Sequence, residues 1–244
     1  MNGKKALVTG SSRGIGRAVA IGLAKDGYEI YVHCAGNIKK AEETKEIIEK
    51  NGGKATIFKA DLCDIEETKK LAEEIKGVDV LVLNASLQIR KKWHEITTDD
   101  VYNQLNCNFV SSLILIQAAV PHMQENKWGR IVTIGSVQEA KPHPDMLIYS
   151  SSKAAQTNMV RSLSLQLAEY GITVNNVAPG VIYTDRNVEA LNDKAYAEKV
   201  MNSIPVGFYG EPEDCAETVR LLCSGGGRYI TGQSIYIDGG KSVQ

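Results

Sequence analysis

The stretch Lys5-Ala6-Leu7-Val8-Thr9-Gly10-Ser11-Ser12-Arg13-Gly14-Ile15-Gly16 decides the fold of this chain. An apolar run at residues 5–9 predicts a strand. Apolar residues then recur every four positions at Ile15, Val19 and Leu23, which predicts a helix directly after the glycines. Glycines at such a turn let backbone N–H groups approach a pyrophosphate at the positive end of the helix. The stretch therefore predicts a nucleotide-binding strand–turn–helix unit.

Apolar, β-branched runs alternate with helical patterns along the rest of the chain. Further strands are predicted at residues 29–33, 55–59, 78–83, 130–134, 173–177 and 234–237, and long helices at 98–123 and from about 149 to 170. A capping-box-like start at Asp64 predicts another helix. This alternation predicts an α/β fold of the Rossmann type, with a doubly wound, seven-stranded parallel sheet and helices on both faces.

The domain organisation is expected to be simple. No internal repeat or Pro- or Ser-rich linker interrupts the sequence, which predicts one domain over residues 1–244. The alternation of predicted strands and helices is interrupted only after the sixth predicted strand, where residues 181–205 are polar and form short helical patterns. Loops beyond the carboxyl ends of the strands bind ligands in open α/β sheets, so this segment is expected to form a substrate lid.

Composition excludes several classes of protein. The formal net charge is -1, from 28 basic and 29 acidic residues, which argues against nucleic acid or an anionic membrane as the main partner. No segment approaches the ~20 apolar residues that span a bilayer. The five cysteines contain no CxxC pair, and no residue cluster is typical of a metal site. We expect a soluble, cytoplasmic protein with reduced thiols.

The stretch Tyr149-Ser150-Ser151-Ser152-Lys153 carries the chemistry that we expect. Residues four apart on a helix share one face, so the phenol and the ammonium lie one turn from each other. A nearby cation lowers the pKa of a tyrosine, which favours general acid–base work. Ser136, at the end of the fifth predicted strand, supplies a hydroxyl thirteen residues upstream.

Together these motifs resemble the short-chain dehydrogenase/reductase family over essentially the whole sequence. The Thr-Gly-x-x-x-Gly-x-Gly turn, the Asn84-Ala85 pair and the Pro179-Gly180-x-Ile182-x-Thr184 segment match family motifs, while Leu83 and Ser86 depart from the usual Asn-Asn-Ala-Gly. The resemblance implies that the following residues bind the cofactor: Gly10, Ser12, Arg13, Gly14, Ile15, Gly16, Asn37, Asp61, Leu62, Asn84, Ala85, Ser86, Tyr149, Lys153, Pro179, Gly180, Ile182 and Thr184.

The same resemblance implies a catalytic tetrad of Asn108, Ser136, Tyr149 and Lys153. Tyr149 would exchange a proton with the oxygen of a ketone or secondary alcohol while hydride moves to or from nicotinamide. Ser136 would hydrogen-bond the reacting oxygen. Lys153 would lower the pKa of Tyr149 and hold the ribose. Asn108 would hold a water in a proton relay, although a buried side chain bonded to backbone is the alternative for this residue.

The end of the second predicted strand indicates the cofactor. An acidic side chain there accepts from the ribose 2′-OH of NAD. The chain instead has His33-Cys34-Ala35-Gly36-Asn37, whereas Arg13 and Lys39 or Lys40 offer positive charge to a 2′-phosphate. We expect NADP, with NAD as the alternative.

The expected substrate is polar: a sugar, a polyol or a hydroxy acid. Donors and aromatic groups come from five expected substrate residues, Gln88, Trp93, His94, Gln138 and Tyr183. Reduction of 3-oxoacyl-acyl-carrier-protein stays as an alternative, although Tyr170 stands where that subgroup has a docking arginine. A non-catalytic dinucleotide sensor or scaffold is the alternative from another class. The resemblance also implies a homodimer or homotetramer.

Overall fold

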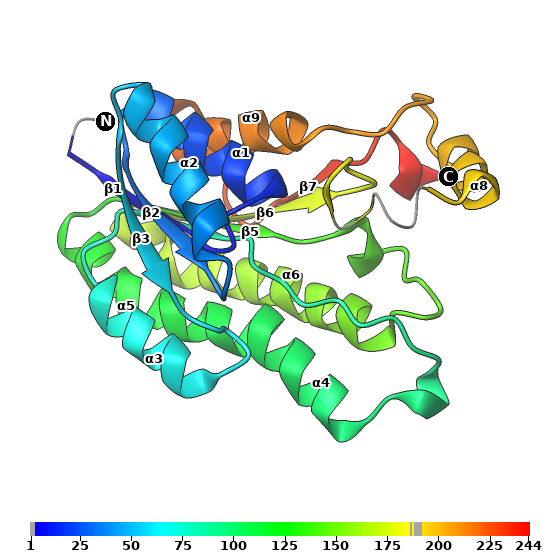
Figure 1. Ribbon diagram of the computed structural model, residues 1–244. Coiled ribbons are helices and arrows are strands. Elements are labelled where there is room, and N and C mark those ends of the chain that lie inside the picture. The colour runs from blue at the N-terminus through cyan, green and yellow to red at the C-terminus, as the bar shows by residue number, and fades with distance from the viewer. Residues whose placement is uncertain (1–2, 186, 188–191) are drawn as a thin grey trace.

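A seven-stranded parallel sheet forms the centre of the computed structural model, which describes residues 3–185, 187 and 192–244 (Figure 1). The strand order is β3-β2-β1-β4-β5-β6-β7. The strands are β1 (Lys5–Val8), β2 (Glu29–Cys34), β3 (Lys54–Lys59), β4 (Val80–Leu83), β5 (Gly129–Ile134), β6 (Ile172–Pro179) and β7 (Ser234–Ile237). Every neighbouring pair is parallel, so the predicted fold class is confirmed.

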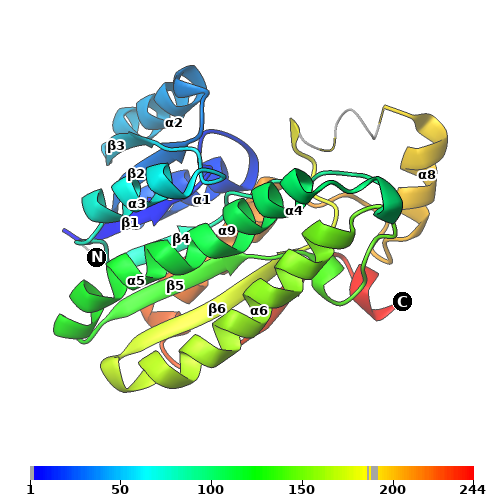
Figure 2. The same cartoon turned by 90° about the horizontal axis from the view of Figure 1, so that it is seen from below.

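Helices cover both faces of the sheet (Figures 1 and 2). One face carries α1 (Gly14–Lys25), α2 (Ile38–Lys50) and α9 (Pro212–Cys223). The other carries α3 (Ile65–Glu74), α4 (Thr98–Leu105), α5 (Ser111–Glu125) and α6 (Leu147–Leu167). Because strands buried on both faces need apolar partners on both, two separate hydrophobic cores form, one on each side of the sheet.

The helix predicted over residues 98–123 is present as an unbroken helical segment from Thr98 to Glu125, but it is not a regular α-helix throughout. A π-helical turn at Asn106–Val110 separates α4 from α5. In this turn the backbone takes up an extra residue, and the hydroxyls of Ser111 and Ser112 donate to the carbonyls of Cys107 and Asn108 at 2.7 and 3.2 Å. The helix predicted from 149 to 170 begins two residues earlier, and its last residues, Ala168–Tyr170, form a 3-10 turn.

The chain order places one crevice at the carboxyl edge of the sheet. From β1 the chain winds outward to β2 and β3, and then returns to β4 on the other side of β1. The connections after β1 and β4 therefore leave in opposite directions, which opens the sheet edge between them. This topological switch point is where the glycine-rich turn lies.

The predicted lid at 181–205 is described only in part, because residues 186 and 188–191 lie outside the described residues. Within the described part, Ile182 forms a parallel bridge with Gly210 and α8 covers Lys194–Asn202. No helix among residues 3–185, 187 and 192–244 is both long and apolar enough to cross a membrane.

Candidate active site

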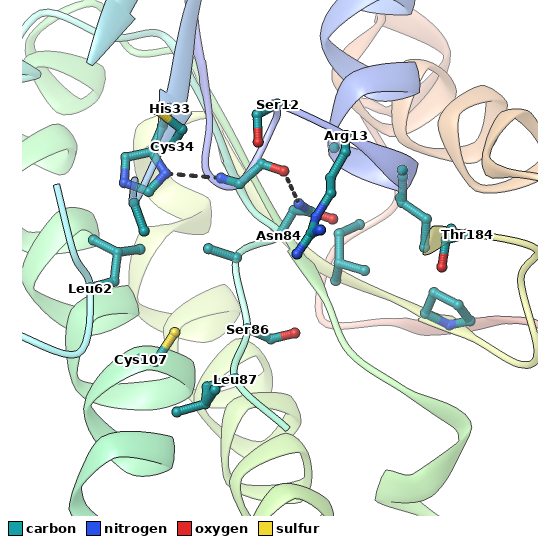
Figure 3. A pocket seen from close by; sticks show the side chains of 18 of the residues that line it. Ser12, Arg13, His33, Cys34, Leu62, Asn84, Ser86, Leu87, Cys107 and Thr184 are labelled. Carbon is teal, nitrogen blue, oxygen red and sulfur yellow. Dashed lines mark hydrogen bonds between the residues drawn. The ribbon is translucent and has the colours of Figure 1, made fainter. Parts of the chain in front are cut away.

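A cavity of about 480 Å³ lies at the switch point (Figure 3). Most of the residues predicted for the cofactor and for catalysis line it: Gly10, Ser12, Arg13, Gly14, Ile15, Gly16, Asp61, Leu62, Asn84, Ala85, Ser86, Ser136, Tyr149, Pro179, Gly180, Ile182 and Thr184. They come from the glycine turn, from the ends of β3, β4, β5 and β6, and, for Tyr149, from α6. The fold thus brings seventeen predicted positions to one cavity wall, although they are spread over most of the sequence.

The glycine-rich turn needs its glycines for two different reasons. Gly14 has a φ of +54°, in the left-handed region that side chains with a Cβ disfavour. Gly16 has no room for a Cβ, because that atom would lie 2.5 Å from the carbonyl oxygen of Gly10 and from Nδ2 of Asn84. The same Asn84 amide donates to the carbonyls of Thr9 and Gly10 at 2.8 and 3.2 Å, which fixes the turn against β4.

His33 also holds the turn, and the sequence reasoning missed its role. Its Nδ1 accepts from the backbone N–H of Gly10 at 2.9 Å, and its Nε2 lies 3.0 Å from the Ala60 carbonyl (Figure 3). These partners require Nε2 to carry the proton. Burial lowers the pKa of His33 to about 4, against an opposing hydrogen bond to Ala60. The role of His33 could have been suspected from the sequence, because it is a polar residue at the end of β2, beside the glycine turn.

Ser136 and Tyr149 line the same cavity as the glycine-rich turn, whereas Lys153 is 1% exposed and is not part of the cavity wall. The Lys153 ammonium donates to the carbonyl of Ile134 at 2.7 Å and lies 5.7 Å from the centre of the Tyr149 ring. The predicted one-turn spacing on α6 is therefore present. Ser136 Oγ accepts from the N–H of Gln138 at 3.2 Å.

Asn108 does not line the cavity; its side chain is fully buried in the π-helical turn. Its Oδ1 accepts from the N–H of Leu87 at 2.8 Å, and its Nδ2 donates to the carbonyl of Leu87 and to Ser152 Oγ, both at 2.9 Å. Ser152 in turn donates to the carbonyl of Tyr149 at 2.7 Å. Asn108 therefore joins the loop after β4 to the helix that carries Tyr149, which matches the backbone-bonding alternative.

Positive charge gathers at the mouth of the cavity beside α2. Asp185 faces Lys40 Nζ at 2.7 Å and Arg13 at 4.0 Å, and the hydrogen bond from Lys40 holds the pKa of the Asp185 carboxyl below its usual range. Asn37, predicted to bind the cofactor, is not part of the cavity wall; it caps α2 by accepting from the N–H of Lys40. The chain therefore holds an anionic group between two cations next to the glycine turn.

None of the five predicted substrate residues lines this cavity. Trp93 and Tyr183 are 74% and 48% exposed, His94 is exposed, and Gln88 and Gln138 are half-buried. Gln138 is held by the Ser150 hydroxyl, which donates to its Oε1 at 2.9 Å. Near these residues, Arg90 lies 2.9 Å from Nε2 of His143 and 5.7 Å from the ring of Tyr196 in α8.

Further residues line the cavity without having been predicted: His33, Cys34, Ala35, Cys63, Leu87, Cys107, Ile134, Gly135 and Asp185. Several are apolar side chains whose position depends on which strand ends meet. In the part of the chain that the structure describes, no group of three or more His, Cys, Asp or Glu side chains is arranged to hold a metal ion.

Glu139, three residues after Ser136, was not singled out from the sequence either. Its Oε2 accepts from Thr157 and Asn176 at 2.7 and 2.9 Å, and its Oε1 accepts from Ser234 and Tyr236 at 2.5 and 3.1 Å. One carboxylate thereby ties the loop that follows β5 to α6, β6 and β7. This network fixes the segment on which Ser136 lies.

A dinucleotide-type crevice with a Tyr–Lys pair opposite its glycine turn defines an α/β oxidoreductase site. The family model described as short chain dehydrogenase matches residues 4–195, and the chain belongs to this family. The 3-oxoacyl-[acyl-carrier-protein] reductase FabG of Staphylococcus aureus (strain Mu50 / ATCC 700699) is 37% identical over 97% of both chains. Glucose 1-dehydrogenase 2 of Bacillus subtilis (strain 168) is 34% identical, over 100% of this chain and 96% of the relative.

A solved structure shows the same fold with a cofactor. The 3-oxoacyl (acyl-carrier-protein) reductase from Agrobacterium tumefaciens C58, with NADP bound, superposes with a TM-score of 0.92 at 35% identity. The match covers 98% of this chain and 94% of that one.

Proposed function

We propose that this protein is an NADP-dependent oxidoreductase that interconverts a secondary alcohol and a ketone by hydride transfer. One observation carries the proposal: Tyr149 and Ser136 line the same cavity as the glycine-rich turn, with the buried Lys153 ammonium 5.7 Å from the centre of the Tyr149 ring. A dinucleotide spanning this cavity would place its pyrophosphate at the start of α1 and its nicotinamide beside Tyr149. When bound, the cofactor supplies the hydride donor or acceptor.

The chain's own residues manage the proton and the orientation of the substrate. Tyr149 donates a proton to the ketone oxygen during reduction and removes it from the alcohol during oxidation. Ser136 Oγ accepts from the Gln138 N–H, which leaves its own O–H able to donate to the reacting oxygen. The Lys153 ammonium, held by the Ile134 carbonyl, favours the phenolate of Tyr149. We propose that Asn108 supports this proton path by fixing Leu87 and α6.

The charges at the cavity mouth support NADP over NAD. β2 ends without a carboxylate, and Lys40 and Arg13 converge on one anionic group, the Asp185 carboxylate. A 2′-phosphate offers a larger negative charge and three acceptor oxygens to these two cations. The reductase from Agrobacterium tumefaciens C58, which holds NADP, supports the same assignment.

The polar walls beside the cavity support a sugar-like or hydroxy-acid substrate. Arg90 and His143 come from different loops yet lie 2.9 Å apart, and Arg90 also lies over the ring of Tyr196 in α8. His143 Nε2 accepts from Arg90, and the other N–H groups of this guanidinium suit the hydroxyls or the carboxylate of a small polar ketone. The relative glucose 1-dehydrogenase 2 supports a sugar-like substrate. We propose that residues 181–205, within one domain of residues 1–244, close over it as a lid.

A second candidate, reduction of 3-oxoacyl-acyl-carrier-protein, is favoured by the 37% identical reductase of Staphylococcus aureus (strain Mu50 / ATCC 700699). The two are separated by comparing kcat/KM for NADPH oxidation with ketoses, 2-oxo and 5-oxo sugar acids, and 3-oxoacyl thioesters. A higher kcat/KM for the thioesters than for every sugar derivative would favour the second candidate.

The catalytic assignment is tested with Tyr149→Phe. Loss of the proton donor should lower kcat by about 10²-fold to 10⁴-fold, while NADPH binding, followed by fluorescence titration, stays within about twofold. Ser136→Ala should lower kcat less, because it removes orientation only. Full activity in Tyr149→Phe would refute the mechanism. NADPH binding without turnover of any ketone or alcohol by the unmodified protein would instead favour a sensor or scaffold.

We also propose a cytoplasmic homodimer or homotetramer. The five cysteines are all free thiols, which suits a reducing compartment. α4, α5 and α6 lie side by side across one face of the sheet and offer a broad helical surface for a second copy (Figure 2). A monomeric mass in light scattering would refute the oligomer.

A further inference from the structure

Two cysteines from distant parts of the chain line the same end of the cavity. Cys63 lies in the turn after β3, and Cys107 lies in the π-helical turn directly before Asn108. Both belong to the cavity wall, next to Asp61 and Leu62. Figure 3 shows Cys107 on the same side of the cavity as Leu62. In the family that this chain belongs to, the aspartate matching Asp61 contacts the adenine ring, so, if the proposed NADP site is correct, these thiols flank the adenine.

The two turns are held against each other. The side-chain amide of Asn106 donates to the carbonyl of Cys63 at 3.2 Å, and Oδ1 of Asp61 accepts from the N–H of Cys63 at 2.9 Å. Each thiol also shifts the pKa of the other. The two turns therefore bring both thiols close together in one cavity wall.

This proximity makes Cys107 different from the other thiols. The hydrogen bond from Cys63 holds the pKa of Cys107 below its usual range, although burial opposes it, and the charge of Lys153 acts in the same direction. By contrast, burial raises the pKa of Cys34, and it raises the pKa of Cys215 and of Cys223 to about 12. A thiolate is the reactive form of cysteine, so oxidants should select Cys107.

We propose that Cys63 and Cys107 form a peroxide-sensitive dithiol whose oxidation closes the adenine end of the cavity. The Cys107 thiolate attacks one oxygen of hydrogen peroxide, the O–O bond breaks, and hydroxide leaves and takes up the proton that Cys107 had released. The sulfur of Cys63 then attacks the resulting sulfenic acid. Its S–O bond breaks, and the oxygen leaves as water with the proton of Cys63. Two thiols are oxidised and one peroxide is reduced to two waters.

The proposed disulfide has a direct consequence for the cofactor. It would tie the turn after β3 to the π-helical turn across the wall that Leu62 and Cys107 share. This consequence rests on the proposed function, because it requires NADP to bind there. A bound adenine would in turn cover both sulfurs, so NADP should protect them from peroxide.

The test begins with the reduced, full-length protein and hydrogen peroxide. Mass spectrometry of a non-reducing digest should show a peptide that links Cys63 to Cys107, which disappears with dithiothreitol and decreases when NADP is saturating. Cys63→Ser and Cys107→Ser should each abolish this peptide. Cys34→Ser is the matched control, because Cys34 lines the same cavity, and it should leave the peptide unchanged. Even if a variant misfolds, the digest of the wild-type protein shows whether Cys63 and Cys107 form a disulfide.

The effect of oxidation on cofactor binding is measured separately. NADPH affinity, measured by fluorescence titration, should fall at least about tenfold on oxidation and return with dithiothreitol. Absence of the linked peptide would overturn the dithiol. A linked peptide with unchanged NADPH affinity would overturn closure of the cavity. If the reduced protein failed to bind NADPH at all, the proposed function would be wrong, whereas the linked peptide would still test the dithiol.

Discussion

His33 Nδ1 accepts a hydrogen bond from the backbone N–H of Gly10, at 2.9 Å, and so joins β2 to the glycine-rich turn after β1. The N–H of His33 donates to Ser11 Oγ at 3.0 Å, and Nε2 lies at the same distance from the carbonyl of Ala60 after β3. One neutral side chain therefore holds three strand ends in place. A protonated imidazole cannot accept from Gly10, which makes this contact sensitive to pH.

We expect His33 to make the protein less stable in acid. Its pKa is 6.5 for the unperturbed side chain and about 4 in the fold, so the unfolded chain binds the proton more readily. The stabilising contribution of the neutral side chain is fully present above pH 6.5 and is lost as the pH falls toward 4. Over this range the free energy of unfolding falls by about 3 kcal/mol. Asn at this position offers an acceptor without titrating. Urea unfolding should therefore show that acidification from pH 7 to pH 4 destabilises the wild type more than His33→Asn. An equal loss in both proteins would contradict a neutral His33.

Gly16→Ala should disrupt the turn without harming the helix. The added Cβ meets the Gly10 carbonyl oxygen and the Asn84 amide at 2.5 Å, so the turn must move, although alanine itself favours a helix. NADPH affinity should fall by more than about tenfold in a fluorescence titration. Gly36→Ala is the control, because nothing lies within 4 Å of its added Cβ. Equal affinities in the two variants would show that the turn does not hold the cofactor.

Asn108→Ala should cost both stability and turnover. It leaves the half-buried N–H and carbonyl of Leu87 without their partner, a loss of up to about 1–3 kcal/mol for each unsatisfied group. Ser152→Ala is the matched control, since it removes only the hydroxyl between Asn108 and the Tyr149 carbonyl and should cost about 1 kcal/mol. Thermal unfolding and kcat are measured on both. A milder effect of Asn108→Ala than of Ser152→Ala would contradict the bonding role of Asn108.

Lys40→Ala should change the choice of cofactor. Removing the ammonium that faces Asp185 is expected to raise the KM for NADPH by about tenfold and to leave the KM for NADH unchanged, because only NADPH carries the 2′-phosphate. Lys39→Ala tests its exposed neighbour and should change neither value. Initial rates with both cofactors give the ratio. Initial rates tenfold higher with NADH than with NADPH for the wild type would contradict the assignment of NADP.

Local patterns in the sequence determined the order and kind of the elements. Continuous apolar runs predicted the seven parallel strands, because strands covered by helices on both faces must be apolar on both. The glycine turn and the spacing of Tyr149 and Lys153 were readable for the same reason: each motif depends on residues within one or two helical turns. Ser136 could be placed because it follows the end of a strand by two residues. The π-helical turn escaped prediction, since the apolar spacing around it still resembles a continuous helix.

Only the tertiary structure decided which side chains meet. Gly10 and His33 are 23 residues apart, Lys40 and Asp185 are 145 apart, and the Cys63 and Cys107 thiols come from separate turns. These contacts depend on strand order and register, which a periodic pattern does not encode. The sequence by itself therefore determined a nucleotide-binding α/β fold with a tyrosine and a lysine on one helix. The tertiary structure decided what holds the glycine turn, which cations face an anion, and which two thiols share a cavity wall, because each depends on packing between distant segments.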